Sequence, residues 1–280
     1  MSDNTVFKTE LEERINKINE QIESYLPEEK GHQSTIFEAM NYSVRAGGKR
    51  LRPLFMQEIC RLFTGEVQPA VVPFMAAIEM IHTSSLVHDD LPCMDDDMMR
   101  RGKASTWAEY GEDMGVLAGD ALMIYAFEVA AKAFNEVSEA DDLKRVGRAI
   151  EILAAKTGIY GMIGGQCADI CAEELPSDQV TKELLWYIHK NKTAALIEAA
   201  LMIGAVLAGA SDEAVKKLEQ AAENIGIAFQ IQDDILDVTS SLEVLGKPVG
   251  SDEKNHKVTY VRLNGLEQSK KMWKHCRKKH

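Results

Sequence analysis

The chain has 280 residues, of which 45% are hydrophobic and 27% charged, so it has enough apolar material for a sizeable core. Its formal net charge is −12 and its sequence pI is about 5.1, which argues against a general nucleic-acid binder. An anionic ligand would therefore need a local basic site.

The N-terminal segment and the cysteines bear on the compartment. The first residues, MSDNTVFKTELEER, are charged and lack the apolar stretch of a signal peptide. The most apolar run, residues 194–210, contains Glu198 and is shorter than a typical membrane span. The five cysteines match no zinc spacing, so we expect reduced thiols, with Cys167 and Cys171 as core-facing neighbours on one helix. These features predict a cytoplasmic protein with no nucleic-acid partner and no membrane insertion.

Helical periodicity runs through most of the chain. Phe7, Leu11, Ile15, Ile18 and Ile22 recur at helical spacing with charged residues between them. Further helices are predicted over residues 34–45, 51–63, 70–88, 114–137, 140–158, 178–207 and 211–238. Alternating strand patterns are almost absent. The sequence therefore predicts an all-α protein of roughly ten helices.

The sequence has no repeat, low-complexity tract or long linker that would mark a domain boundary. We therefore expect a single domain over residues 1–280. The glycine-rich segment TGIYGMIGGQ lacks the preceding strand and the spacing of a nucleotide fingerprint. It predicts a place where two helices approach closely.

The segment HDDLPCMDDD, residues 88–97, is unusually acidic. Asp89 and Asp90 close a predicted helix, because Pro92 pushes the residue before it out of the α region. Asp95 and its two acidic neighbours then belong to the following turn. Taken alone, this segment is typical of a solvated acidic loop.

A second acidic segment, FQIQDDILD at residues 229–237, lies on a predicted helix. Gln230, Asp233 and Asp237 share one face by their spacing of three and four residues. Like charges at this spacing, among apolar neighbours, cost free energy that a cation should offset. The two segments together favour Mg²⁺, which takes carboxylate oxygens and completes its shell with water and substrate phosphates.

Positive charge accompanies the acidic segments. Arg100 and Arg101 follow the first one, and GGKRLRP supplies Lys49, Arg50 and Arg52 earlier in the chain. Arginine makes bidentate contacts to phosphate, and lysine contributes a compact charge. The sequence has no Gly-x-Ser-x-Gly elbow or other convincing nucleophile. We therefore expect metals and cations to activate a phosphorylated leaving group without a covalent enzyme intermediate.

The sequence resembles the trans-isoprenyl diphosphate synthases, in particular the bacterial farnesyl and the closely similar geranylgeranyl enzymes. The motifs GGKRLRP, DDLPCMD followed by RRG, GDAL, GGQ, KT, FQIQDDILD and GK occur in the family's order over residues 47–260. The resemblance implies a helical bundle around a deep central cavity, a homodimer, and three Mg²⁺ ions once substrate is bound. It implies the head-to-tail (1′-4) condensation of isopentenyl diphosphate with dimethylallyl, geranyl or farnesyl diphosphate, giving a longer prenyl diphosphate and releasing diphosphate.

The resemblance also assigns roles to residues that match the family's motifs. The implied magnesium ligands are Asp89, Asp95 and Asp233, with Asp90 and Asp237 behind them. The positions that match contacts to the allylic diphosphate are Arg100, Lys192 and Lys247. Two polar residues that steady the reacting segment match Thr193 and Gln230. The positions that match the isopentenyl diphosphate site are Lys49, Arg52, His82 and Arg101.

The resemblance implies that product length depends on the residues one turn or so before Asp89. Ser84 and Ser85 lie ~6–7.5 Å earlier along that helix, where they would form the floor under the growing prenyl tail. Many farnesyl synthases of this type carry an aromatic residue where this chain has Ser84. The resemblance implies farnesyl diphosphate as the product, and the small Ser84 makes geranylgeranyl diphosphate the alternative.

The C-terminal segment LEQSKKMWKHCRKKH is abruptly basic, and we expect an atypical, shortened end without the usual final helix. Two other functions share some of these features. A terpene cyclase would share the first acidic motif, but its second motif normally differs from DDILD and it lacks a GGKRLRP site. A noncatalytic prenyl synthase subunit would be expected to have lost one acidic motif, and both are intact here.

Overall fold

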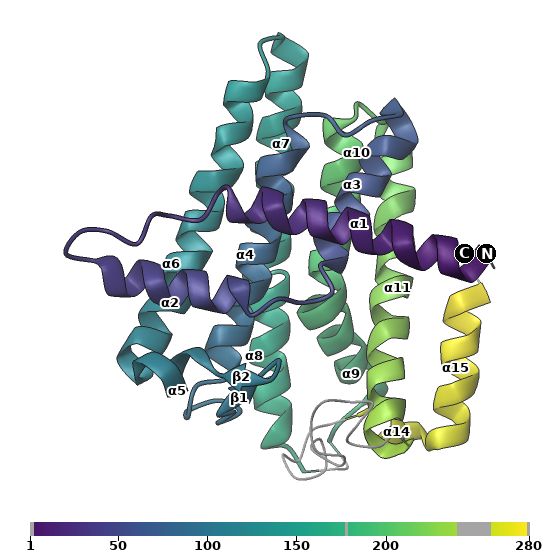
Figure 1. Ribbon diagram of the computed structural model, residues 1–280. Helices are drawn as coiled ribbons and strands as arrows, with labels where there is room; N and C mark the ends of the chain where they lie inside the picture. Colours follow the sequence, from purple (N-terminus) through teal and green to yellow (C-terminus); the bar gives the residue numbers. More distant parts are fainter. Residues whose placement is uncertain (1–2, 177–178, 240–258, 279–280) are drawn as a thin grey trace. The chain divides into compact units, whose positions relative to one another are not determined.

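The computed structural model describes residues 3–176, 179–239 and 259–278, which are almost entirely helical (Figure 1). The sheet in this part of the chain is a two-stranded hairpin. The all-α prediction is therefore confirmed. The described residues fall into two compact units, one within residues 1–150 and 203–210 and the other within 151–202 and 211–280. The expectation of one domain over residues 1–280 stays a prediction.

The first unit is built around one buried helix. Its elements are α1 (Asp3–Glu23), α2 (Ser34–Arg45), α3 (Leu51–Thr64), α4 (Val71–Asp89), β1 (Met99–Arg100), β2 (Lys103–Ala104), α5 (Thr106–Tyr110), α6 (Glu112–Ala131), the 3₁₀ helix η1 (Lys132–Glu136) and the first part of α7 (Ala140–Thr157). In α4, Phe74, Met75, Ile78 and Ile81 are fully buried. A helix that is apolar on all sides belongs in a core, and α4 packs against α1, α2, α3 and α6.

Two helices of this unit have the length and composition of a membrane span, α4 and the segment Glu112–Glu136. Most of the apolar window of α4 is buried inside the protein, as in the core helix of a globular protein. Length and composition alone are therefore weak evidence for a membrane segment here.

The hairpin that follows the first acidic segment has a two-residue turn. Met99 pairs with Ala104 and Arg100 pairs with Lys103, so Arg101 and Gly102 form the turn. Both have positive φ, 54° and 78°, as a type I′ turn requires. Arginine rarely adopts positive φ, and such strain is typical of functional sites.

The second unit carries the other acidic segment. It contains the end of α7, α8 (Met162–Glu173), α9 (Lys182–Ile188), the π-helix η2 (His189–Ala194), the first part of α10 (Ala195–Leu207), α11 (Asp212–Thr239), α14 (Tyr260–Asn264) and α15 (Leu266–Lys278). The single helix predicted over residues 178–207 is therefore divided into α9, η2 and α10. Short π segments inside helices are frequent at functional sites.

The C-terminal segment forms a helix, α15, which the sequence analysis did not predict. Helix α15 packs on α11, and its Met272 and Trp273 join the cluster around Leu185, Ile227 and Ile231. Lys271 and Lys274 lie on the opposite, more exposed side of the helix. The helix was not predicted because its amphipathic pattern is short and contains many lysine and arginine residues.

The glycine-rich segment does bring two helices together. A Cβ atom on Gly165 of α8 would lie 2.2 Å from the backbone nitrogen of Lys192 in η2, so only glycine fits there. The expectation that Cys167 and Cys171 face the core is wrong, because both are exposed free thiols on α8. Their spacing puts them on one face, and spacing alone does not say which face is buried.

Candidate active site

The first acidic segment folds back on the end of α4. The amide nitrogen of Asp95 donates to the carbonyl oxygen of Asp89 over 2.9 Å, and that of Asp97 donates to Asp90 over 3.1 Å. These bonds satisfy carbonyl groups that a helix end leaves without intrahelical partners. They also bring the backbones of Asp89 and Asp95 side by side, although a loop of five residues separates them in sequence. Both side chains are partly exposed.

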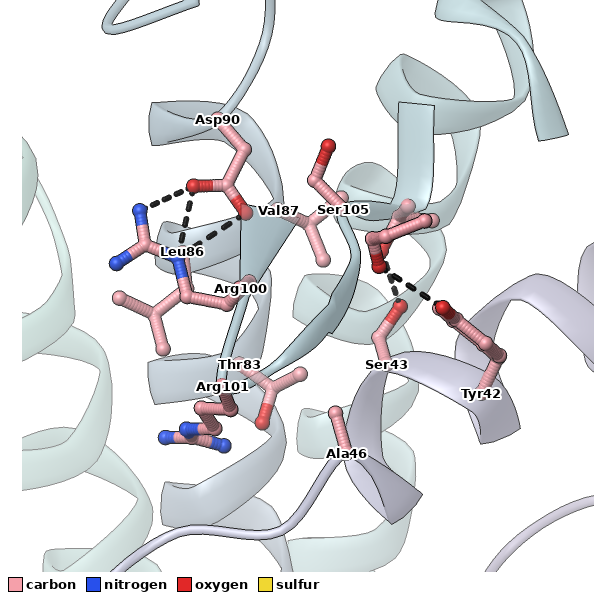
Figure 2. Close-up of a pocket in the computed structure, with 12 residues that line it drawn as sticks. Tyr42, Ser43, Ala46, Thr83, Leu86, Val87, Asp90, Arg100, Arg101 and Ser105 are labelled. Atoms are coloured by element: carbon pink, nitrogen blue, oxygen red, sulfur yellow. Dashed lines mark hydrogen bonds and ion pairs between the residues drawn. The ribbon is translucent and has the colours of Figure 1, made fainter. Parts of the chain in front are cut away.

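Asp90 lies behind these two residues and binds Arg100. Its carboxylate is 2% exposed and accepts a hydrogen bond from Nε of Arg100 over 2.9 Å, with a second ion-pair contact from Nη2. Burial raises the pKa of Asp90 to about 6, although the guanidinium of Arg100 acts to lower it. Figure 2 shows the two side chains facing each other. Carboxylates are unfavourable at the negative end of a helix, and Arg100 offsets part of that cost.

Arginines surround His82 on α4. Burial, together with Arg52, Arg101 and two further arginines, holds the pKa of His82 well below its ordinary value, so the imidazole is neutral. Burial and the charge of Arg101 also lower the pKa of Arg52. The Nε of Arg52 is buried and has no hydrogen-bond partner among the described residues. An unpaired buried cationic donor is costly, and an anion is the ligand that would relieve that cost.

Arg101 reaches from the hairpin to the turn before α3. Its Nη1 donates to the carbonyl oxygen of Gly47, and its guanidinium lies against Gly48. A Cβ atom on Gly48, which has φ +146°, would lie 2.8 Å from Nη2 of Arg101. Gly47 therefore binds the Arg101 side chain and Gly48 leaves space for it, which lets Arg101 lie near Arg52.

Arg50 is buried in a structural ion pair and is not available to a ligand. Its guanidinium donates to Oε1 of Glu79 over 2.7 Å, to Oδ1 of Asn19 over 2.8 Å and to the carbonyl oxygen of Val44 over 2.7 Å. The side chains of Arg50 and Glu79 are 4% and 2% exposed. Arg50, which the resemblance assigned no substrate contact, is thus a structural residue, whereas the neighbouring Lys49 is exposed.

A small pocket lies beside the arginines, lined by Ser43, Thr83, Asp90, Arg101 and Ser105 among others (Figure 2). Its volume is about 20 Å³, room for about one water molecule. The pocket is therefore too small for a prenyl substrate.

In the second unit, Lys192 and Thr193 lie on η2, and Gln230 lies on α11. Nζ of Lys192 is 2.6 Å from Oδ2 of Asp169 on α8. The hydroxyl of Thr193 donates to Oε1 of Gln230 over 3.0 Å. The structure therefore brings Thr193 and Gln230 together, and Gly165 lets α8 approach the segment that carries Lys192.

The aspartates of the second motif differ in burial. Asp234 and Asp237 are each 2% exposed, whereas Asp233 is partly exposed. Asp234 accepts hydrogen bonds from Nε2 of Gln230 over 3.1 Å and from the backbone nitrogen of Tyr260 over 2.7 Å. Lys247 lies outside the described residues.

The two serines of the predicted tail floor are placed differently. Ser84 is fully buried, and its Oγ has no hydrogen-bond partner within the described part of the chain. Ser85 is partly buried and donates to the carbonyl oxygen of His82 over 2.8 Å. Ser84 is therefore the more deeply buried of the two serines, and the chain-length role of both stays a prediction.

The donors at both acidic segments suit Mg²⁺. In the parts of the chain that the structure describes, no group of three or more His, Cys, Asp or Glu side chains forms a ready-made metal cage. Magnesium is usually held by one or two carboxylates together with waters and substrate phosphates. Asp89, Asp95 and Asp233 offer partly exposed carboxylates of that kind, and the charge of Asp89 helps to raise the pKa of Arg100.

Residues 33–280 match the polyprenyl synthetase family. The chain belongs to this family. The match includes both acidic motifs, GGKRLRP, the hairpin arginines and η2, so each part of the candidate site falls inside it.

Relatives in the polyprenyl synthetase family are named for prenyl diphosphates. Geranylgeranyl pyrophosphate synthase 11, chloroplastic, of Arabidopsis thaliana is 48% identical over 238 residues, 85% of this chain and 66% of that protein. The Arabidopsis heterodimeric geranylgeranyl pyrophosphate synthase large subunit 1 is 48% identical over 84% of this chain and 62% of its own length. The chain thus spans slightly less than two thirds of these relatives.

Solved members of the family have the same fold. A geranyltransferase from Helicobacter pylori, complexed with magnesium and isoprenyl diphosphate, matches with a TM-score of 0.82 and 33% identity over 100% of this chain and 89% of that one. An FPP/GFPP synthase from Zymomonas mobilis matches with a TM-score of 0.83 and 32% identity, covering 97% and 90% of the two chains.

Sequence reasoning missed two features of the polyprenyl synthetase site. The first is the Arg50–Glu79 ion pair, which joins residues 29 positions apart and leaves no local pattern. The second is the role of Asp234, whose spacing of four residues from Gln230 was a usable signal for a helical hydrogen bond.

Proposed function

We propose that the chain is a magnesium-dependent prenyltransferase that condenses isopentenyl diphosphate with allylic diphosphates. The observation that carries this proposal is the unpaired, buried Nε of Arg52 among the arginines around His82. Such a site favours a compact polyanion. Lys49, Arg52, His82 and Arg101 are the proposed contacts to isopentenyl diphosphate.

The second substrate is an allylic diphosphate, held by the two acidic motifs. Asp89, Asp95 and Asp233 are the proposed magnesium ligands. Bound magnesium supplies charge neutralisation for the departing diphosphate. Arg100, Lys192 and Lys247 are the proposed cationic contacts to the same diphosphate, as the resemblance implies.

The reaction follows from charge placement. The allylic C–O bond breaks as negative charge grows on the leaving diphosphate, where fixed cations stabilise it most. The double bond of isopentenyl diphosphate forms the new C–C bond, and the proton that it loses goes to the released diphosphate. Because His82 is held neutral, it can donate a hydrogen bond without adding a charge.

We propose geranylgeranyl diphosphate as the principal product, ahead of the farnesyl diphosphate that the sequence analysis put first. Ser84 is small and fully buried, so it leaves the tail room that an aromatic side chain would fill. The names of the Arabidopsis relatives support the longer product, whereas the geranyltransferase and FPP/GFPP synthase structures keep farnesyl diphosphate as the alternative.

A homodimer is part of the proposal. Helix α6 exposes Val116, Leu117 and Ile124, the last of them 72% exposed, and an apolar strip of this kind is a typical subunit contact. One relative is named as a heterodimeric large subunit. Light scattering on the purified chain distinguishes a dimer from a monomer that needs another partner. A cytoplasmic location stays a prediction.

Calorimetric binding of isopentenyl diphosphate tests the substrate assignment. We expect Arg52→Gln to weaken binding about 10- to 100-fold, because a charge-assisted contact in a buried site is lost. Arg61→Gln is the matched control, because Arg61 is an exposed arginine of the same helix. Equal affinities of the wild-type and Arg52→Gln proteins would contradict the proposed site.

A further inference from the structure

A chain of hydrogen bonds in the second unit joins η2, α11 and α14. The hydroxyl of Thr193 donates to Oε1 of Gln230 over 3.0 Å, and Nε2 of Gln230 donates to Oδ1 of Asp234 over 3.1 Å. The backbone nitrogen of Tyr260 donates to Oδ2 of Asp234 over 2.7 Å. Both carboxylate oxygens of Asp234 are therefore engaged inside the protein.

A contact between two aromatic rings joins the two ends of this series of hydrogen bonds. The ring of Tyr260 lies 6.2 Å from that of His189, centroid to centroid. His189 lies on η2, four residues before Thr193. Tyr260 is also part of the apolar cluster with Ile227 and Ile231 of α11. The position of η2 on α11 is therefore fixed at two places, and Asp234 takes part in the polar one.

The carboxylate of Asp234 determines which group donates and which accepts in each hydrogen bond of this series. Both carboxylate oxygens of Asp234 accept hydrogen bonds here, so the part of Gln230 that faces Asp234 is its NH₂ group. The carbonyl oxygen of Gln230 must then point to Thr193, whose hydroxyl donates to it. Asp234 thus sets the amide orientation of Gln230 and the direction of the Thr193 hydroxyl.

We propose that Asp234 is a positioning residue: it orients Gln230 and Thr193 for the allylic diphosphate and does not hold magnesium itself. This inference rests on the proposed prenyltransferase function. A buried carboxylate costs desolvation energy that its hydrogen bonds only offset, so fold stability alone is a weak reason to keep it. Its position between Tyr260 and Gln230 supplies a functional reason.

The variant Asp234→Asn separates orientation from folding. Its side-chain oxygen can still accept from the Tyr260 nitrogen, and its NH₂ group can donate to Gln230 once the Gln230 amide turns round, so that the NH₂ group of Gln230 then faces Thr193. We expect wild-type thermal stability and wild-type hydrogen exchange at the Tyr260 amide, with kcat for prenyl transfer lower by about 10-fold or more. Asp141→Asn makes the same chemical change at an exposed residue of α7 and should leave all three unchanged.

A purely structural role predicts a different result. In that case activity follows stability, and an Asp234→Asn protein as stable as wild type would be as active as wild type. That result would overturn the proposal, and so would a kcat that stays unchanged while only the KM for isopentenyl diphosphate rises.

A second pair of variants tests the orientation without an activity assay. In Gln230→Glu two carboxylates face each other, so the urea midpoint should fall. Adding Asp234→Asn restores a donor opposite an acceptor, so the double variant should recover most of that loss. Additive losses would mean that Asp234 does not orient Gln230. If the wild-type chain turns over no substrate, the proposed function fails, and this coupling still decides the hydrogen-bond assignment.

Discussion

The amide nitrogen of Asp95 donates to the carbonyl oxygen of Asp89 over 2.9 Å, so the loop of the first acidic motif closes on the last residue of α4. This bond explains the spacing of the two aspartates. Five intervening residues are enough to turn the chain back, and Pro92 ends the helix so that it can turn. The side chains then start from adjacent backbone positions.

We predict that Asp89→Asn lowers turnover at least ~100-fold, because a neutral amide is a far weaker magnesium ligand and electrostatic stabilisation is lost where charge develops. The assay is steady-state turnover of isopentenyl diphosphate with excess magnesium. Asp96→Asn is the matched control: Asp96 is exposed, lies in the same turn and has φ 53°, a conformation that asparagine tolerates. Equal turnover of the two variants would contradict a metal role for Asp89.

The Gly48–Arg101 contact predicts a substrate-specific defect. Gly48→Ala should push the Arg101 guanidinium away and raise the KM for isopentenyl diphosphate about 10-fold, with a smaller effect on the allylic substrate. Gly47→Ala is the control, because it adds the same methyl group at a positive φ but meets nothing within 4 Å. Both variants carry backbone strain, so a KM change shared equally by both would assign the effect to strain and not to Arg101.

Removing one partner of the Arg50–Glu79 pair should be strongly destabilising. We predict that Glu79→Leu lowers the free energy of unfolding by about 3–5 kcal/mol, because it leaves a buried guanidinium without its counter-ion. Urea unfolding measures this value. The double variant Arg50→Met/Glu79→Leu should lose less, since no charge then remains buried; a double variant less stable than the single one would show that the pair is not the cause.

His189 predicts a pH dependence of stability. Burial lowers its pKa to about 4, well below the value near 6.5 of an unfolded chain. The unfolded state therefore binds more protons between these pH values, so this contribution is complete above about pH 6.5 and is lost as the pH falls toward 4. It amounts to ~2 kcal/mol between pH 7.5 and 5.

Urea midpoints of wild type and His189→Gln at pH 7.5 and 5 measure this contribution. The charged neighbours of His189 are Asp169 and Lys192, which shift its pKa in opposite directions. We expect a smaller pH-dependent loss in the variant. An identical loss in both proteins would assign the pH dependence to other groups.

Much of the fold could be predicted because helical periodicity is local. The predicted segment over residues 34–45 matches α2 (Ser34–Arg45), and the apolar run before Asp89 matches α4. The π-helix η2 could not be predicted, since six residues are too few for the apolar pattern to distinguish a π turn from an α-helical one. The hairpin turn at Arg101 and Gly102 escaped notice because strands of two residues leave no alternation.

Part of the site could also be predicted, because some of its residues are close together in sequence. Asp89 and Asp95 sit in one contiguous motif, so their neighbourhood follows from a short loop. The buried pairing of Arg50 depends on Asn19 and Glu79, which lie far away in sequence, and charge alone suggested a phosphate contact instead. The outward orientation of Cys167 and Cys171 also depends on which helix covers α8, and spacing does not contain that information.

Ser84 gives a prediction about product length. Ser84→Phe should shorten the principal product by one isoprene unit, because an aromatic ring fills the space beside α4 that the tail would occupy. Mass spectrometry of the products measures this. Ser84→Ala is the control, since it keeps the space and removes a hydroxyl that has no partner among the described residues. A folded Ser84→Phe protein with an unchanged product would place the floor of the tail site elsewhere.

The most direct measurement is a product assay on the purified chain alone, with isopentenyl diphosphate and, separately, dimethylallyl, geranyl and farnesyl diphosphates. Each reaction is run with magnesium and with a chelator, and the products are identified by mass spectrometry. We expect magnesium-dependent formation of a prenyl diphosphate, with geranylgeranyl diphosphate as the principal product. Absence of turnover with all three primers, or turnover that the chelator does not abolish, would contradict it.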